Sequence, residues 1–98
     1  MIWTLDSALQ LIRNLQPGCE ERGWYLALAG GVLNKGHSTG DLDLVAMPKY
    51  YRSNMEDLYS YLSKEFGSYP LIQSAVPSAN HWSWDVIEVS VVRHAGKN

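Results

Sequence analysis

Two aspartates separated by a single leucine are the residues of this chain whose types and spacing best suit chemistry. Asp41 and Asp43 belong to the segment Asp-Leu-Asp-Leu, in which polar and apolar residues alternate. Residues two apart on a β-strand point to the same face, with backbones about 6–7 Å apart. Such a pair suits Mg²⁺, which prefers a few carboxylates completed by substrate phosphates and waters. Two such ions could clamp the attacking and leaving oxygens of a phosphoryl displacement.

A pair of glycines, Gly30 and Gly31, closes an apolar run upstream of the aspartates. Glycine lets the backbone approach a bulky anion closely, and exposed amides at a strand end can bind phosphate oxygens. Residues 32–40 separate the glycines from Asp41. Each motif alone also fits a tight turn or a solvated strand start, so their order along the chain is the informative feature.

The polar connection between the two motifs carries side chains that suit a phosphate. Lys35 could bind one through its charge, and Ser38 or Thr39 could donate a hydrogen bond to one. The alternative is a solvated loop, since these residue types are common wherever a loop faces water. The histidines of the chain show no metal-ligand spacing, so a zinc site is not expected.

Taken together, these residues resemble the signature of the nucleotidyltransferase superfamily, which includes DNA polymerase β, the tRNA CCA-adding enzymes and the minimal bacterial nucleotidyltransferases. That signature is a hydrophobic residue, Gly, Gly or Ser, a short gap, and then Asp-hydrophobic-Asp. The resemblance covers residues 26–47. The matching positions are Ala29, Gly30, Gly31, Asp41, Leu42, Asp43 and Leu44.

The superfamily places a third carboxylate on a later strand, facing the aspartate pair. Asp85 and Glu88 are the candidates, and they are three apart, so on a regular strand they would face opposite sides. The run from Ile87 to Arg93 looks like the CCA-adding version, in which an acid-hydrophobic pair begins a strand that ends in arginine. This favours Glu88, although aspartate is the usual residue. Arg93 becomes a candidate phosphate contact, with a solvated strand end as the alternative.

The resemblance implies a Mg²⁺-dependent (or Mn²⁺-dependent) enzyme that transfers a nucleoside monophosphate from a nucleoside triphosphate to a hydroxyl of a protein, an RNA or a small molecule. Asp41, Asp43 and Glu88 would hold the metal ions, and Glu88 would help to deprotonate the hydroxyl. The nucleotide would be bound by Gly30, Gly31, Lys35, Ser38, Thr39 and Arg93.

Small members of the superfamily that resemble this chain often work beside a protein partner, as in toxin–antitoxin pairs, or occur in phages and mobile elements. The main alternative is a non-catalytic module that keeps the nucleotidyltransferase fold and binds a protein. A nuclease that uses the same acids is a third reading, but the sequence provides no basic groove for it.

The elements that must position these residues follow from hydrophobic periodicity. Apolar residues at helical spacing predict a helix over residues 5–15, capped by Thr4 or Asp6 and stopped by Pro17-Gly18. Residues 24–29 read as a buried strand. Residues 41–46 alternate as a strand with one solvent-facing side.

The second half of the chain predicts one helix and two strands. Ser53 and Glu56 form a capping-box pair at the start of a helix that ends at Gly67, with an apolar stripe of Met55, Leu58, Tyr59, Leu62 and Phe66. Residues 70–75 and 82–92 read as strands, joined by a loop over residues 76–80. Trp82 and Trp84 share a strand face, where packing beneath a helix is favoured over stacking a base. The order of elements predicts an α/β (α+β) fold with a small mixed β-sheet flanked by helices.

The composition indicates one domain over residues 1–98. The chain has 98 residues, 46% of them hydrophobic, which is enough for one core of ordinary domain size. The formal net charge is −2, and scattered Lys and Arg give no strongly basic face for nucleic acid. Cys19 is the single cysteine, so we expect a structural thiol and neither a disulfide nor a cysteine zinc site.

The longest apolar stretch, residues 24–33, is interrupted by glycines and falls short of the roughly 20 residues that a transmembrane helix needs. The N-terminus lacks the basic region of a signal peptide and carries Asp6 early. We therefore expect a cytoplasmic protein without membrane contact. Its expected partners are a nucleoside triphosphate and a protein partner or acceptor, with RNA as the other acceptor considered.

Overall fold

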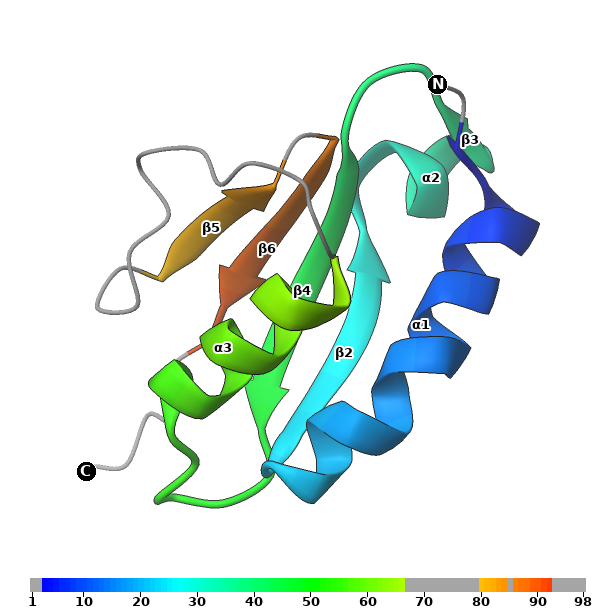
Figure 1. The fold of residues 1–98 in the computed structure, drawn as a ribbon. Helices are drawn as coiled ribbons and strands as arrows, with labels where there is room; N and C mark the ends of the chain where they lie inside the picture. The colour runs from blue at the N-terminus through cyan, green and yellow to red at the C-terminus, as the bar shows by residue number, and fades with distance from the viewer. Residues whose placement is uncertain (1–2, 67–79, 85, 93–98) are drawn as a thin grey trace.

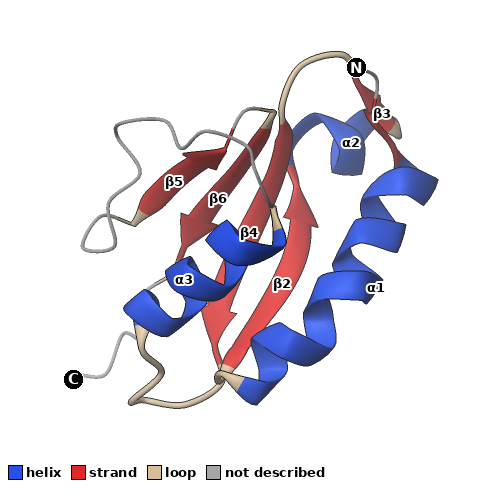
Figure 2. Cartoon of the chain, viewed as in Figure 1, coloured by secondary structure: helices blue, strands red, loops and turns tan. Residues whose placement is uncertain are grey.

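The computed structural model describes residues 3–66, 80–84 and 86–92 (Figure 1). A four-stranded mixed sheet is covered on one side by two helices, and a short two-stranded pairing lies beside it (Figure 2). This confirms a small mixed α/β architecture compatible with the α+β class. Within these residues, no helix is long and apolar enough to cross a membrane. The elements are β1 (Trp3–Thr4), α1 (Leu5–Glu21), β2 (Trp24–Ala29), α2 (Gly30–Lys35), β3 (His37–Ser38), β4 (Leu42–Pro48), α3 (Met55–Glu65), β5 (His81–Trp84) and β6 (Ile87–Val91).

The strands of the main sheet lie in the order β2-β4-β6-β5. β2 pairs with β4 in antiparallel fashion, β4 with β6 in parallel, and β6 with β5 in antiparallel fashion. The parallel pair requires a crossover, and α3 lies within it, on the same side of the sheet as α1 (Figure 1). The strand predicted over residues 70–75 and most of the loop after it lie outside the described residues.

Alternation along each strand divides the sheet into a buried and an uncovered face. The buried face packs against Ala8, Ile12, Leu15 and Cys19 of α1 and Leu58 and Leu62 of α3 in one core. It consists of Trp24, Leu26, Leu42, Leu44, Ala46, Trp82, Trp84, Ile87, Val89 and Val91. The uncovered face, over which no described helix lies, carries Tyr25, Ala27, Ala29, Asp43, Val45, Met47, His81, Ser83, Glu88 and Ser90.

Helix α1 is longer than the periodicity predicts. Thr4 caps it as expected, accepting a hydrogen bond from Ser7 N. The predicted stop at Pro17 is wrong, because the helix continues to Glu21. Proline removes one helical hydrogen bond, but the turn beyond it buries Cys19 completely and packs Gly18 against Tyr61 so closely that a Cβ would not fit. These tertiary contacts offset the lost bond.

The thiol of Cys19 is free and lies in the core. Burial raises its pKa to about 12, so it stays protonated and unreactive at neutral pH. The prediction of a structural thiol is confirmed.

The cap of α3 differs from the predicted capping box. Asn54 is the N-cap, and its side chain accepts hydrogen bonds from Glu56 N and Asp57 N. The Ser53 side chain does not cap the helix, because its hydroxyl donates to Gly23 O and accepts from Tyr50 N. The hydroxyl therefore joins the turn after β4 to the start of β2, which leaves the next residue to cap the helix.

The predicted strand over residues 82–92 is two strands, β5 and β6, joined as a hairpin in which Trp84 pairs with Ile87. The burial pattern records the reversal: Trp82 and Trp84 are buried at even positions, whereas Ile87 and the residues that follow are buried at odd positions. Such a change of phase cannot occur within one regular strand.

The aromatic residues of the last third pack as expected. Trp82 and Trp84 are both fully buried, so the alternative of base stacking is wrong. Tyr59 of α3 lies edge-on to Trp82, with ring centroids 5.2 Å apart, and Phe66 lies at the same centroid distance from Trp84. The apolar stripe of α3 thus covers the β5 side of the sheet.

The outer edge of β2 is closed by a side chain. Gln16 of α1 donates from Nε2 to Leu26 O at 3.0 Å and accepts from Leu26 N at Oε1 at 2.9 Å. The primary amide thus occupies both backbone groups of Leu26, as a neighbouring strand would. Buried backbone groups need such partners.

We expect Gln16→Ala to lower the free energy of unfolding by about 1–3 kcal/mol, because both backbone groups of Leu26 lose their partner in a partly buried place. The matched control is Gln10→Ala on the same helix, whose amide bonds only the exposed Asn14 and whose loss should stay within about 0.5 kcal/mol. Urea denaturation measures both. Equal effects would show that the Gln16–Leu26 contact adds no stability.

Candidate active site

The uncovered face brings Asp43 and Glu88 side by side. They are register partners on the parallel strands β4 and β6, and partners in a parallel pair share a face. Ala29 of β2 continues the row beyond Asp43, and Ser83 of β5 continues it beyond Glu88. Along this row the acids are therefore flanked by small side chains.

Asp41 completes the acidic group from the residue before β4. Hydrogen bonding with the nearby Asp41 side chain raises the pKa of Glu88, with partial burial adding to the rise. Two carboxylates can share a hydrogen bond only if one keeps a proton, so the bond favours the neutral form. A hydrogen bond from His81 acts in the opposite direction and lowers the pKa of Glu88.

Asp43 is turned toward β2. Its carboxylate lies directly against Gly30, which has a positive φ of 67° and no room for a Cβ. The Asp43 carboxylate is thus packed against the glycine that begins α2. Among the described residues, no three His, Cys, Asp or Glu side chains are arranged to hold a metal ion. The acids share a face, as the sequence predicts, but they do not converge on one point.

Gly30 and Gly31 begin the short helix α2, and the two glycines differ in their surroundings. At Gly31 an added Cβ would meet nothing nearer than 3.7 Å, in ordinary contact with His37 and Ser38. The close approach is therefore specific to Gly30. The sequence predicts such an approach by a phosphate, whereas the group found against Gly30 is the carboxylate of Asp43.

The loop between α2 and β4 is shaped by its own hydrogen bonds. Ser38 donates from its hydroxyl to Asp41 O at 3.2 Å and accepts from Gly40 N at the same distance. The hydroxyl proton that was predicted to reach a phosphate is thus used to hold the turn before Asp41. Lys35 and Thr39 are exposed, so their side chains are accessible from solvent.

A second pairing anchors the same loop. β1 pairs with β3, and Leu5 N donates to Gly36 O at 3.1 Å. The start of α1 is therefore tied to the segment between the glycine pair and the aspartates.

His81 belongs to the site although its spacing gave no sign of it. Its Nε2 lies 2.8 Å from Glu88 Oε1, and its Nδ1 lies 3.1 Å from Ser90 Oγ. A signal was present in the sequence. The apolar residues fall at even positions up to Trp84 and at odd positions from Ile87 on. A hairpin that turns between these two residues pairs His81 with Ser90.

Two of the residues named from the sequence, Asp85 and Arg93, lie outside the described residues. The structure therefore does not test Asp85 as the third acid. For Glu88 the placement is favourable, since it lies in the row of Asp43 and contacts Asp41.

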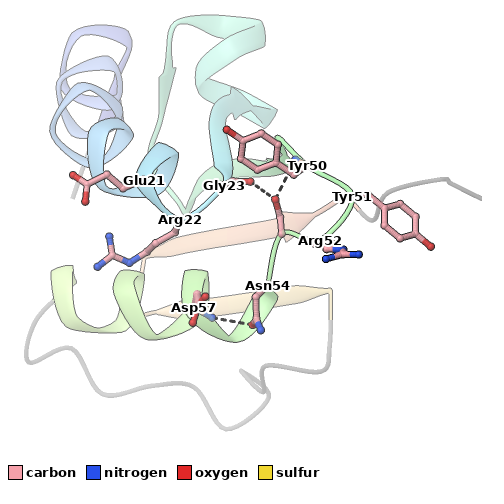
Figure 3. A pocket seen from close by; sticks show the side chains of 9 residues that line it. Glu21, Arg22, Gly23, Tyr50, Tyr51, Arg52, Asn54 and Asp57 are labelled. Carbon is pink, nitrogen blue, oxygen red and sulfur yellow. Dashed lines mark hydrogen bonds between the residues drawn. The ribbon is translucent and has the colours of Figure 1, made fainter.

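A hollow of about 660 Å³ lies at the opposite end of the sheet, where β2 begins and β4 ends (Figure 3). Many of its polar groups have structural partners: Arg22 donates to Gly18 O and stacks on Tyr61, and Asn54 caps α3. We therefore take the acidic group as the candidate site rather than this hollow. Its lining residues are Glu21, Arg22, Gly23, Tyr50, Tyr51, Arg52, Ser53, Asn54 and Asp57.

Comparison of the chain with protein-family models, with curated protein sequences and with solved structures found no match. The chemistry of the site is therefore inferred from its own residues and their arrangement.

We expect Gly30→Ala to destabilise the fold by about 1–3 kcal/mol, because it forces a side chain into a positive φ and displaces the Asp43 carboxylate. Gly31→Ala is the matched control. It has ordinary contacts and a helical position, so alanine should be neutral or stabilising by up to about 1 kcal/mol. Thermal and urea denaturation measure both variants, and similar effects would contradict the described contact between Gly30 and Asp43.

In metal-free buffer with a chelator, we expect Glu88→Gln to raise the melting temperature by an amount that grows with pH. The raised pKa means that folded Glu88 keeps its proton where the unfolded chain has lost it. Its contribution to stability is thus complete below the ordinary glutamate pKa and is lost as pH rises through the folded value.

The difference between Glu88→Gln and wild type should accordingly be near zero at about pH 4 and should widen toward neutral pH. Glu65→Gln, at an exposed position of α3, is the control. A difference that does not change with pH would show that Glu88 and Asp41 do not share a proton.

Proposed function

We propose that this chain has a nucleotidyltransferase fold and transfers a nucleoside monophosphate from a nucleoside triphosphate to a hydroxyl acceptor. The observation that carries the proposal is the row on the uncovered face. Gly30, which follows β2, lies against Asp43 of β4, and Asp43 pairs with Glu88 of β6. The glycine pair, the aspartate strand and the later acid thus meet at one end of one sheet.

The donor set fits a hard divalent cation such as Mg²⁺ or Mn²⁺. Asp41, Asp43 and Glu88 offer only carboxylate oxygens, which is the chemistry that these cations select. The hydrogen bond between Asp41 and Glu88 supports the fit, because a cation could take the place of the shared proton. For all three acids to bind together, Asp43 would have to turn away from Gly30. When bound, the cation would supply positive charge to the phosphate oxygens of the nucleotide.

In the proposed transfer, the acceptor oxygen attacks the α-phosphorus and the bond to the β-phosphate oxygen breaks, so pyrophosphate leaves. Glu88 is the group proposed to receive the proton of the acceptor hydroxyl. Hydrogen bonding with Asp41 and partial burial raise its pKa in the metal-free protein, which makes it a better base than an ordinary glutamate. Lys35, Thr39 and Arg93 remain the proposed contacts of the triphosphate, with Gly31 offering an unobstructed backbone.

One observation favours a second candidate, a non-catalytic module of the same fold that binds a protein. In the arrangement described, Asp43 contacts Gly30 and does not join the other two acids. A module of this kind would keep the acids as part of its surface and would bind neither cation nor nucleotide. The two candidates therefore differ in a measurable property.

We expect Mg²⁺ together with a nucleoside triphosphate to raise the melting temperature of the wild type. At about 100 times the dissociation constant the gain is about 2.7 kcal/mol, or several degrees for a domain of this size. Asp41→Asn and Asp43→Asn should remove the ligand-dependent rise without lowering the metal-free melting temperature. Asp57→Asn, in the hollow at the other end of the sheet, should leave the rise unchanged.

The activity itself is tested by incubating the purified protein with Mg²⁺ and each α-labelled nucleoside triphosphate in cell lysate. Label on a discrete protein or RNA band, seen with wild type and absent with Asp43→Asn, would support the transfer and name the acceptor class. Neither label nor ligand-dependent stabilisation would favour the non-catalytic module.

A further inference from the structure

The ring of His81 lies between two groups of the neighbouring strand. Nε2 is 2.8 Å from Glu88 Oε1, and Nδ1 is 3.1 Å from Ser90 Oγ. The register explains this contact. His81 pairs directly with Ser90 in the antiparallel hairpin, and Glu88 is the diagonal neighbour on the same face, within reach of a long side chain.

Glu88 needs a partner of this kind more than an aspartate would. A glutamate side chain has one more rotatable bond than an aspartate, and about 30% of the Glu88 side chain is exposed. Holding a mobile side chain in one rotamer costs conformational entropy at the moment of binding unless a neighbour already holds it. His81 from β5 supplies such a partner through its hydrogen bond to Glu88 Oε1.

The hydrogen-bond pattern assigns a role to each ring nitrogen. When Glu88 is ionised, as a cation ligand would be, its oxygens can only accept, so Nε2 donates to Glu88. In the neutral ring Nδ1 then accepts from the hydroxyl of Ser90. Glu88 thus selects the tautomer, and the bond to Ser90 fixes the orientation of the ring, in the way that outer residues orient the ligands of metal sites.

We propose that His81 is a positioning residue for the candidate cation site: it holds the Glu88 carboxylate beside Asp41 and is itself held by Ser90. This inference rests on the proposed function, since it assigns Glu88 to the cation. His81 is not proposed as a ligand, because its Nε2 is already bonded to Glu88.

The test compares Mn²⁺ binding by the full chain and its variants, followed by the electron paramagnetic resonance signal of free Mn²⁺. His81→Gln keeps an amide donor near the place of Nε2, and we expect its dissociation constant to stay within about threefold of wild type. His81→Asn keeps a polar group only near Nδ1, and His81→Ala keeps neither. For both, the dissociation constant should rise about 10- to 100-fold, the usual effect of losing an outer-sphere partner.

Ser83→Ala is the matched control, because Ser83 lies on the same strand and pairs directly with Glu88. It should bind Mn²⁺ like the wild type. Metal-free melting temperatures of the same variants separate the two roles. If His81 were merely structural, all three His81 variants would melt at a lower temperature, and His81→Gln would not bind Mn²⁺ more tightly than His81→Asn. If His81→Ala does not fold, the comparison of Gln with Asn decides.

The outcomes separate this inference from the function on which it rests. Wild type that binds no Mn²⁺ would overturn the proposed function, and the positioning role with it. Binding that is lost in Asp43→Asn but equal in wild type, His81→Gln and His81→Asn would overturn only the positioning role. Equal weakening of the Gln and Asn variants would also overturn it, because the donor at Nε2 would then be irrelevant.

Discussion

In the parallel pairing of β4 with β6, the chain joins two segments that lie nearly half its length apart, and both the core and the candidate site depend on their register. The pairing that sets Leu44 against Val89 in the buried layer also sets Asp43 against Glu88 on the uncovered face. Because side chains alternate with a period of two, a slip of either strand by one residue would turn its acid into the core. The hydrophobic contacts of α1 and α3 thus keep the acids at the surface.

That arrangement has an electrostatic cost, which the surrounding residues reduce. Like charges at short distance destabilise a folded protein, and this face gathers Asp41, Asp43 and Glu88. The raised pKa of Glu88 favours its neutral form, and the ring of His81 hydrogen-bonds to its carboxyl group, so both reduce that cost. A site that is less stable than it could be is common where binding or catalysis needs the strain.

The elements with strong local periodicity were predictable. β2 has the predicted bounds, the aspartate strand is displaced by only one or two residues at its ends, and the apolar stripe of α3 is buried as expected. The errors arose where tertiary contacts override local signals. Pro17 lies inside α1 because residues beyond it pack into the core, and Ser53 does not cap α3 because it is bonded to Gly23.

The candidate site was predictable in part for the same reason. Sequence spacing placed Asp41 and Asp43 on one face, because two-residue periodicity is a local property, whereas the preference for Glu88 came from the resemblance to the CCA-adding enzymes. The direction in which Asp43 turns, the hydrogen bond between Asp41 and Glu88 and the role of His81 are not local. They depend on which strands pair. In residues 82–92 the sequence signal of the hairpin is that the apolar residues change from even positions (Trp82, Trp84) to odd positions from Ile87 on.

The bond between Gln16 and Leu26 also bears on how the protein behaves at high concentration. An edge strand with free backbone groups is a template on which a second chain can add a strand, and proteins commonly protect such edges. β2 is short, and the amide of Gln16 occupies both groups of a residue near its middle. A second copy approaching this edge would have to break those bonds before it could form a continuous ladder. The side chain of Gln16 thus protects the β2 edge from the addition of a strand by another chain.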